Sequence, residues 1–456
     1  MEIKTKSDHA AILKALKANG KDRDKIEDLM AEYKDIDRNL RDSQVDRIQK
    51  DKIVGDKRKI VRGVRLPIPF QHKIVNTATA FEVGAGSTIT PETENALSEF
   101  VVPLWKKLRL DDKIQQAVSL RKSELQCALL FCFEAPQKST LYTKLTGANK
   151  GKTPKCRVLE NKNGNMYPYY DAFGGMKAFT WEFKEIIDDK ERSSTWVYTD
   201  TKIHKYQENI YLGSEIHGFS KIPIVYTDQD YVEWHVAKKL IDRIEVSLSK
   251  LAASNDYAGH PLLLLYGDVD GAPNKDEDGK AFHIRPTRDE EGKVIWGDVK
   301  FLVNEQAPEA ARLELDKLEK FIYSLTSTPD ISFDNIKGLR ASGVAIHLMF
   351  LDAMIKARMN EGRNRTMIER SLNILKSGIT TTTKTSLKYL EQDTTFDVTF
   401  KSIIPQDINN TVQTVATAIE SGFASKLTGV KMAGLTKDIK EEIELIKKDQ
   451  ESVNND

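Results

Sequence analysis

The sequence predicts an α+β protein that is mainly helical and divided into several parts. Apolar residues recur at helical spacing over residues 229–256, about 307–326 and 343–376, which predicts three long helices. Between residues 129 and 226, short apolar or aromatic runs alternate with Gly, Asn, Asp and Lys, which is typical of an antiparallel sheet of hairpins. At 456 residues the chain is long enough for more than one domain.

Composition excludes several classes of protein. Charged residues make up 30% of the chain and hydrophobic residues 40%, as in a soluble globular protein, and the net charge of +1 argues against a general nucleic-acid binder. Cys127, Cys132 and Cys156 are too few and too irregularly spaced for a disulfide framework or a zinc site, so we interpret them as buried free thiols. No apolar run is long enough to span a membrane, and the first ten residues lack the apolar core of a signal peptide. We therefore expect a protein that is made and used without crossing a membrane.

The N-terminal part begins with a charged helical arm, residues 1–60, that carries a sparse apolar face. This face allows two interpretations, a solvated arm or a contact with another subunit; its apolar residues are Ile12, Leu13, Leu16, Ile26, Leu29, Met30 and Tyr33. Residues 61–228 predict a mixed α/β region. Within it, residues 97–130 have helical spacing, with Pro103 acceptable near the start of the helix.

A helix, a β-rich insert and a second helix follow. The first helix, residues 229–258, has an apolar face formed by Val232, Val236, Leu240, Ile244 and Leu248. The insert, residues 259–304, has three predicted strands joined by acidic, turn-rich linkers; the strands are Leu262–Tyr266, Phe282–Arg285 and Val294–Trp296. The second helix, residues 305–328, accepts Pro308 in its first turn.

A polar loop, residues 329–342, separates the second helix from a long third helix. Pro329 ends the helix before it, and Ser342 stands at the N-cap position of the next one. The long helix has an apolar face formed by Val344, Leu348, Leu351, Ile355 and Met359. Gly362 is a candidate for a bend within this helix, and Gly378 for its C-cap.

The C-terminal part combines strands and helices. Ser386–Tyr389 and Phe396–Ile404 read as strands, and the region 343–404 therefore joins the long helix to two strands. Residues 405–456 predict a final helical block that opens at Pro405 and breaks at Gly422.

No motif for catalysis, metal binding or cofactor binding survives inspection. The segment Gly147–Thr153 resembles a phosphate-binding loop, but it has three residues where four are needed before Gly-Lys, and Pro154 follows directly. The acidic turn Asn274–Gly279 resembles half a calcium loop, but Arg285 occupies the position of the bidentate Glu. The histidines form no metal-binding pair, and no nucleophile elbow is present. We therefore expect no catalytic residue, no metal and no cofactor.

The order of elements and several short motifs resemble tailed-bacteriophage portal proteins, in the siphophage branch typical of Gram-positive hosts. Thr328-Pro329-Asp330 and Ser342-Gly343-Val344-Ala345 match the two ends of that family's tunnel loop, and His217–Val225 matches the strand before its stem. The resemblance extends from about Pro67 to the C-terminus and is most specific from residue 217 to 360.

The resemblance implies a portal fold with wing, stem, clip and crown. These parts correspond to the wing at 61–228, the first stem helix at 229–258, the clip at 259–304, the second stem helix at 305–328, the tunnel loop at 329–342, the kinked helix and wing strands at 343–404, and the crown at 405–456.

The same resemblance implies a function and a set of partners. Portal subunits form a ring, usually a dodecamer, through which double-stranded DNA is packaged and ejected without sequence specificity. The ring docks the terminase, which supplies the ATPase activity, and later the head-completion or adaptor and tail proteins. It also meets the major capsid and scaffolding proteins. The expected location is the portal vertex of the virion, reached by assembly in the host cytoplasm. Two alternatives remain: a structural scaffold or adaptor that is not a portal, and a P-loop nucleotide-binding enzyme.

The tunnel loop holds the candidate site residues. The positions expected to face DNA are Asp330, Ser332, Asp334, Asn335, Lys337 and Arg340; those expected to pack one loop on its neighbour are Ile331, Phe333, Ile336 and Leu339. Repeated around a ring, Lys337 and Arg340 would hold phosphate weakly, while Asp330 and Asp334 would repel it. Gly362 is expected to set the kink of the long helix.

Overall fold

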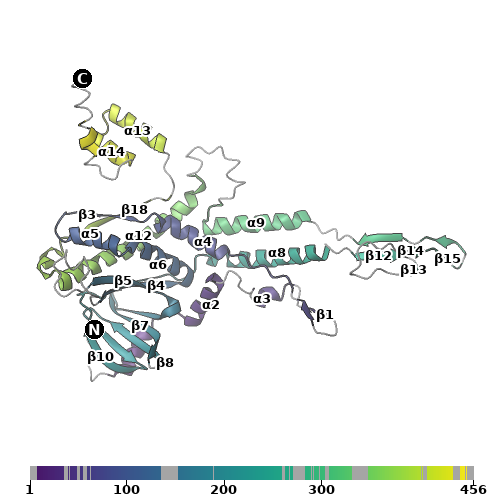
Figure 1. The fold of residues 1–456 in the computed structure, drawn as a ribbon, viewed down its shortest axis with the longest axis horizontal. Coiled ribbons are helices and arrows are strands. Elements are labelled where there is room, and N and C mark those ends of the chain that lie inside the picture. The colour runs from purple at the N-terminus through teal and green to yellow at the C-terminus, as the bar shows by residue number, and fades with distance from the viewer. Residues whose placement is uncertain are drawn as a thin grey trace.

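A computed structural model describes most of the chain. The described residues are 8–34, 40, 42–48, 52–54, 59–61, 63–134, 153–187, 189–258, 262–266, 268–270, 283–288, 290, 292–296, 298–302, 308–330, 348–401, 403, 408–434, 442–446 and 448. The molecule is elongated (Figure 1): a body of sheets and helices lies at one end, and two long helices run side by side from it to a tip made of strands.

Two antiparallel sheets form the lower part of the body. The first is a five-stranded meander in the order β10-β9-β8-β7-β6, and the second has the order β11-β4-β5. Their strands are β4 Gln126–Glu134, β5 Thr153–Leu159, β6 Gly164–Tyr170, β7 Met176–Ile187, β8 Lys190–Tyr198, β9 Lys202–Gln207, β10 Ile210–Ile216 and β11 Ile224–Asp228. Phe179, Trp181 and Tyr198 of the meander share one core with Leu130 and Ile224 of the other sheet. The predicted antiparallel sheet of hairpins is confirmed.

The N-terminal helices pack on the body of their own chain. α1 His9–Lys17 lies on the meander, where Leu13 and Leu16 are buried against Ala178 and Val197. Three further elements complete the described N-terminal part: α2 Arg23–Lys34, α3 Asp42–Val45, and a hairpin of β1 Lys52–Val54 and β2 Lys59–Val61. The helical prediction is confirmed for α1, α2 and α3, but residues 52–54 and 59–61 form a hairpin instead. α1 is not the solvated arm that its charge suggested, because Leu13 and Leu16 are buried.

A layer of helices covers the other side of the β11-β4-β5 sheet. It contains α4 Phe70–Thr79 with its π-helical extension η1 Ala80–Gly84, α5 Ser98–Lys107, α6 Leu110–Glu124 and α12 Leu351–Gly378. β3 Ser87–Pro91 pairs with β18 Phe396–Phe400 beside this layer. A core shared by these helices and the sheet includes Trp105, Val118, Leu129 and Leu372.

The prediction of a single helix over residues 97–130 is wrong. The chain leaves helical geometry at Arg109 and again at Leu125, which have φ of 50° and 70°, and β4 begins directly after Leu125. Pro103 lies in the interior of α5 rather than at its start, which removes one backbone hydrogen bond.

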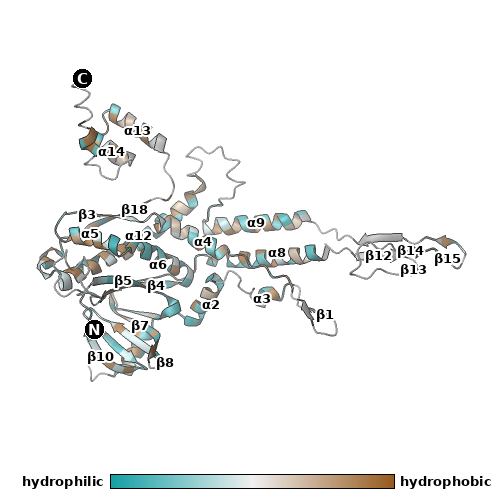
Figure 2. Cartoon of the chain, in the orientation of Figure 1, coloured by the Kyte–Doolittle hydropathy of each residue, from teal (hydrophilic) through white to brown (hydrophobic). Residues whose placement is uncertain are grey.

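Two helices and the strands between them form the projection. α8 Lys238–Ala258 and α9 Pro308–Thr326 pack along their length and share the Arg243–Glu314 ion pair at 2.7 Å. Hydrophilic and hydrophobic residues alternate along both helices (Figure 2), as expected when one face packs and the other is exposed. The described strands of the tip pair as β12 Leu262–Tyr266 with β17 Asp298–Leu302, β13 Asp268–Asp270 with β14 His283–Arg285, and β15 Thr287–Arg288 with β16 Val294–Ile295. The helix–insert–helix order is confirmed, and β13, β15 and β17 are additional to the prediction.

The first of these helices begins later than expected. Residues 229–234 are not helical, and only the short 3-10 turn η3 His235–Ala237 precedes α8. Two carbonyls near the end of α6 accept amides of this segment: Gln229 N donates to Leu125 O at 2.9 Å and Glu233 N to Lys122 O at 3.0 Å. Val236, expected on the buried face, is 61% exposed.

The region after α12 differs from the prediction in two places. α12 continues into the π-helix η4 Ile379–Thr383, so Gly378 is not a C-cap. Instead, Gly378 permits close packing, since a Cβ there would lie 2.5 Å from the ring of Phe219. The strand expected at Ser386–Tyr389 is the 3-10 helix η5 Thr385–Leu390, in which Leu387 and Leu390 pack on the core at the spacing of one 3-10 turn.

The last described helices stand apart from the body (Figure 1). α13 Ile408–Glu420 and α14 Lys426–Ala433 pack on each other. The turn between them includes Gly422, whose φ of 74° suits glycine, so the predicted break is confirmed.

Candidate functional site

The base of the two-helix projection is where the predicted site begins. α9 ends there in a Schellman motif: Thr328 N donates to Tyr323 O at 2.9 Å, and Ser327 N to Ser324 O at 3.2 Å. Ser327 takes the left-handed position with φ of 54°. Pro329 follows and cannot continue a helix. The predicted helix end before Asp330 is confirmed.

Most of the predicted loop lies outside the described residues. This applies to all ten candidate positions except Asp330, namely Ile331, Ser332, Phe333, Asp334, Asn335, Ile336, Lys337, Leu339 and Arg340, and also to the N-cap expected at Ser342. Asp330 is half-buried, and it lines a shallow pocket of about 230 Å³ together with Tyr323, Met349 and Asp352. Asp330 and Met349, which flank residues 331–347 in the chain, therefore lie close together between α9 and the start of α12.

Lys356 joins three elements at this place. Its Nζ donates to the Thr326 carbonyl oxygen at the end of α9, at 2.6 Å, and pairs with Glu233 Oε1 at 2.5 Å, just before η3. Lys356 itself belongs to α12. One ammonium group thus fixes the start of α12 to the end of α9 and to the segment that precedes α8, and the cation also complements the carbonyl end of α9.

A buried cluster of charges continues from Lys356 into the body. Lys122 Nζ lies between two carboxylates, 2.7 Å from Glu82 Oε1 and 2.9 Å from Glu233 Oε2. Arg121 Nη2 lies 3.4 Å from Glu82 Oε2. The side chains of Arg121, Lys122 and Glu82 are each only 1% exposed, so solvent hardly screens these pairs.

Two amides of α12 complete the cluster. Asn360 Nδ2 donates to Glu82 Oε1 at 2.7 Å, and Asn364 Nδ2 donates to Glu82 Oε2 at 2.9 Å. Arg121 Nη2 also donates to Asn364 Oδ1 at 3.1 Å. Glu82 is therefore the acceptor at which η1, α6 and α12 meet.

The cations of the cluster favour the charged form of Glu233. Burial raises the pKa of Glu233, but the nearby Lys122 and Lys356 outweigh it and hold that pKa below its usual value. Burial lowers the pKa of Arg121, and the charge of Glu82 opposes this shift. With three cations and two carboxylates in contact, the cluster fixes the angle at which α12 crosses α6.

Sequence reasoning missed this cluster. The available signal was the spacing of Lys356, Asn360 and Asn364, which places three polar side chains on one face of a helix next to its apolar face. That spacing alone does not say which distant groups they meet.

Gly362 lies on the exposed side of α12. The helix runs through it without interruption, and a Cβ there would meet nothing within 4 Å. Thr366 Oγ1 donates to Gly362 O at 2.9 Å, and such bonds often bend helices slightly. The kink at Gly362 stays a prediction.

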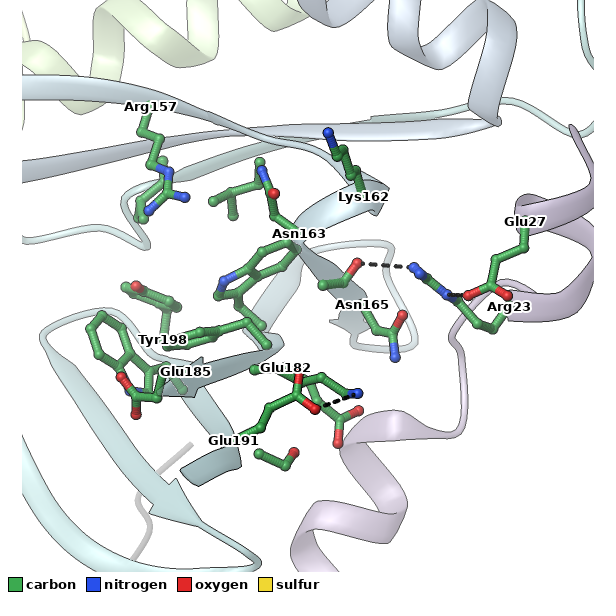
Figure 3. A pocket seen from close by; sticks show the side chains of 18 residues that line it. Arg23, Glu27, Arg157, Lys162, Asn163, Asn165, Glu182, Glu185, Glu191 and Tyr198 are labelled. Atoms are coloured by element: carbon green, nitrogen blue, oxygen red, sulfur yellow. Dashed lines mark hydrogen bonds and ion pairs between the residues drawn. The ribbon is translucent and has the colours of Figure 1, made fainter. Parts of the chain in front are cut away.

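A cleft of about 810 Å³ between the two sheets does not form a catalytic site (Figure 3). Its carboxylates have partners: Glu27 pairs with Arg23 at 2.6 Å, Glu182 with Lys17 at 2.7 Å, and Glu191 with Lys184 at 3.2 Å. Ser194 Oγ donates to Glu185. The Lys17–Glu182 pair joins α1 to the meander, and Arg23 Nη1 of α2 donates to Gly164 O at the start of β6 at 3.4 Å, so the cleft is explained by packing.

Of the three cysteines predicted to be buried free thiols, Cys127 and Cys156 are buried and Cys132 is only partly buried. All three cysteines are free thiols, and burial raises the pKa of Cys127 and raises that of Cys156 to about 12. Within the described ranges, no group of His, Cys, Asp or Glu has the geometry of a metal site. None of the helices described there is long and apolar enough to cross a membrane.

Comparison with protein families identifies the chain. The profile of the family described as "Phage portal protein, SPP1 Gp6-like" matches residues 14–456. The protein belongs to this phage portal family. Its members are structural proteins, and the resemblance read from the tunnel-loop motifs is confirmed at the level of the family.

Comparison with solved structures finds similar chains, two of which come from particle necks. One is in "Neck of empty GTA particle computed with C6 symmetry", with 13% identity, a TM-score of 0.38, and coverage of 80% of this chain and 89% of that chain. The other is in "Neck of native GTA particle computed with C12 symmetry", with 13% identity, a TM-score of 0.39, and coverage of 80% and 92%. The comparison with curated protein sequences gave no match.

Proposed function

We propose that this portal-family chain closes into a ring, typically of twelve subunits, at one vertex of a phage capsid. The proposal rests on the family match over residues 14–456. It is supported by the order of α8, the strand insert, α9, the Thr-Pro-Asp segment and α12. In such a ring α8 and α9 form the stem, the strands between them the clip, and α13 and α14 the crown. Double-stranded DNA passes through the central channel during packaging and ejection.

The tunnel loop is the proposed contact with DNA. Asp330, near its start, and Met349, beyond its end, line one pocket at the base of the stem, where Lys356 fixes α12 to α9. A loop held this way projects from a rigid base. Lys337 and Arg340 then present repeated cations to the phosphate backbone, and Asp330 and Asp334 limit the attraction, so DNA slides without sequence preference.

The proposed partners follow from the ring. The clip faces the terminase during packaging and the head-completion or adaptor protein afterwards, while the wing and crown face the capsid and scaffolding proteins. The protein assembles in the host cytoplasm and ends in the virion. It carries no catalytic step of its own; the terminase supplies the hydrolysis of ATP.

Light scattering after size-exclusion chromatography, combined with negative-stain images, tests the ring. We expect particles of many subunits with a central hole, formed by head-to-tail closure. Monomers or dimers alone, over a range of salt, would contradict the proposal and favour a scaffold or adaptor. In the same preparation, ATP binding that is lost in Lys152→Ala would favour the nucleotide-binding alternative.

A double variant tests the DNA contact separately. Lys337→Ala with Arg340→Ala is expected to leave ring formation intact and to reduce DNA packaging or retention. A matched variant, Lys388→Ala with Lys426→Ala, removes two exposed cations from other surfaces. If DNA packaging is unchanged in the loop variant, the proposed contact of Lys337 and Arg340 with DNA phosphates is wrong, while the proposed ring of subunits is unaffected.

A further inference from the structure

A small basic pocket lies where the α5–α6 turn meets the start of β5. It has a volume of about 290 Å³, and its floor is apolar, formed by Leu104, Leu108 and Pro154 beside Cys156. Leu104, Pro154 and Cys156 are themselves buried. The floor is therefore a fixed part of the body rather than a surface of mobile side chains.

The side chains at the rim of this pocket are all cationic. Lys107, Arg109, Lys113 and Lys155 line it, and no carboxylate of the described residues does. Lys113 Nζ donates to the Cys156 carbonyl oxygen at 2.6 Å, which places one charge firmly at the edge. Lys155 pairs at 2.6 Å with Glu134, which lies outside the lining.

The fold separates these cations from acids that adjoin them in sequence. Asp111 and Asp112 lie between Arg109 and Lys113 in the chain, yet both face away from the pocket. Asp111 accepts hydrogen bonds from Trp105 Nε1 at 3.1 Å and from Ser87 Oγ at 2.7 Å, and Asp112 lines a different pocket, beside Asn76. A stretch of sequence with charges of both signs therefore contributes only positive charges to the rim of the pocket.

Backbone strain at the rim supports a functional role. Arg109 has φ of 50° and ψ of 51°, a left-handed conformation that non-glycine residues adopt at a cost. The tight turn between α5 and α6 requires such a conformation, but glycine or asparagine would meet it with less strain. Arginine at this position adds a charge to the rim.

We infer that this pocket binds an acidic peptide segment of a partner protein, which inserts one large apolar side chain onto the Leu104–Leu108–Pro154 floor. The charge of the rim is complementary to carboxylates on either side of that anchor. An apolar floor favours a peptide over a nucleic-acid backbone, since phosphates and sugars place nothing apolar there.

A fluorescence anisotropy titration tests the inference on the full chain. The probe is a short fluorescein-labelled peptide in which a central Leu-Phe pair is flanked by runs of Asp and Glu. We expect binding that Lys107→Glu with Arg109→Glu weakens by about tenfold or more. The control is Lys388→Glu with Lys426→Glu, which reverses two exposed charges elsewhere and is expected to leave binding unchanged.

Two further comparisons make the test selective. Replacing the Leu-Phe pair of the probe by Ser-Ser is expected to abolish binding, and replacing the acidic runs by Lys is expected to do the same. If the double variant does not fold, Lys155→Glu replaces it as the rim variant, because Lys155 is a half-exposed surface position. Circular dichroism confirms folding of each variant.

Several outcomes would overturn the inference. One is no binding of the acidic Leu-Phe probe by the wild-type chain, and another is equal binding of the Ser-Ser probe. A third is that a short DNA duplex displaces the probe and that the rim variants lose duplex binding as strongly as they lose probe binding. That result would make the rim a phosphate-binding surface.

Discussion

The two halves of α12 bury different kinds of side chain. The C-terminal half follows the usual pattern, with Met367, Ile368, Leu372 and Leu375 buried in the largest core. The N-terminal half turns polar groups inward, and its Lys356, Asn360 and Asn364 meet Glu233 and Glu82.

The outward face of the N-terminal half is apolar. Leu351, Ile355 and Met359 are 46%, 51% and 82% exposed. The sequence predicted this apolar face, and in the single subunit it has no cover. The C-terminal half therefore packs in the core of the subunit, while the N-terminal half is held by directional contacts and leaves its apolar side exposed.

The largest expected effect on stability comes from the polar contacts of the N-terminal half of α12. Glu82→Gln removes the carboxylate that Arg121 and Lys122 share, and it leaves two buried cations poorly compensated. We expect a loss of about 3–5 kcal/mol in the free energy of unfolding, measured by urea denaturation. Glu215→Gln, in an exposed pair with Lys205, is the control and is expected to change stability by less than about 1 kcal/mol. A loss at Glu82 no larger than the control would show that the cluster is not an integral part of the fold.

The apolar sides of the two halves should differ in the same assay. Leu372→Ala creates a cavity in the core and is expected to cost about 2–5 kcal/mol. Ile355→Ala, on the exposed side, is expected to change the subunit's stability by about 0.5 kcal/mol or less. Ile355→Ala is expected instead to lower the yield of rings, as counted in negative-stain images. Equal losses of stability in both variants would remove the distinction between the halves.

The stability that the polar contacts of the N-terminal half of α12 provide should also depend on pH. Because the pKa of Glu233 is lowered in the folded state, its charge contributes stability that is present above its ordinary pKa and is lost as pH falls through the lowered folded value. Glu233→Gln is expected to cost about 1.5–3 kcal/mol at neutral pH and to reduce the slope of stability against pH in the acid range. An unchanged slope would mean that Glu233 has the same pKa in both states.

Gly362→Ala has the smallest expected effect on the subunit. A Cβ there meets no neighbour, so the gain in helix propensity should raise stability by about 1 kcal/mol or less. If glycine sets a bend between the tunnel loop and the wing, the variant should still form fewer rings. Rings of unchanged yield and shape would show that the glycine is incidental to assembly.

Much of the fold was predictable from particular patterns. The start of α9 at Pro308, its end before Pro329, the strand at Leu262–Tyr266 and the break at Gly422 were all predicted from local signals and are confirmed. Predictions from local signals failed where contacts with residues distant in sequence set the conformation. Carbonyl groups at the end of α6 bind residues 229–234 in a non-helical conformation. Leu387 and Leu390 pack on the core from a 3-10 turn rather than from a strand. Of the ten candidate site residues in the loop, only Asp330 lies within the described part of the chain.

The sequence by itself determined most of the elements, their order and the family, because periodicity and turn residues act over a few neighbouring positions. The tertiary structure alone decided which charges meet. Glu82, Lys122, Glu233 and Lys356 come from four separate places in the chain, and nothing local to any of them names its partners. The basic pocket is decided in the same way, because the orientation of α6 sends Asp111 and Asp112 away from Arg109 and Lys113. Burial makes such pairings selective, since a charge removed from water is stable only beside its partner.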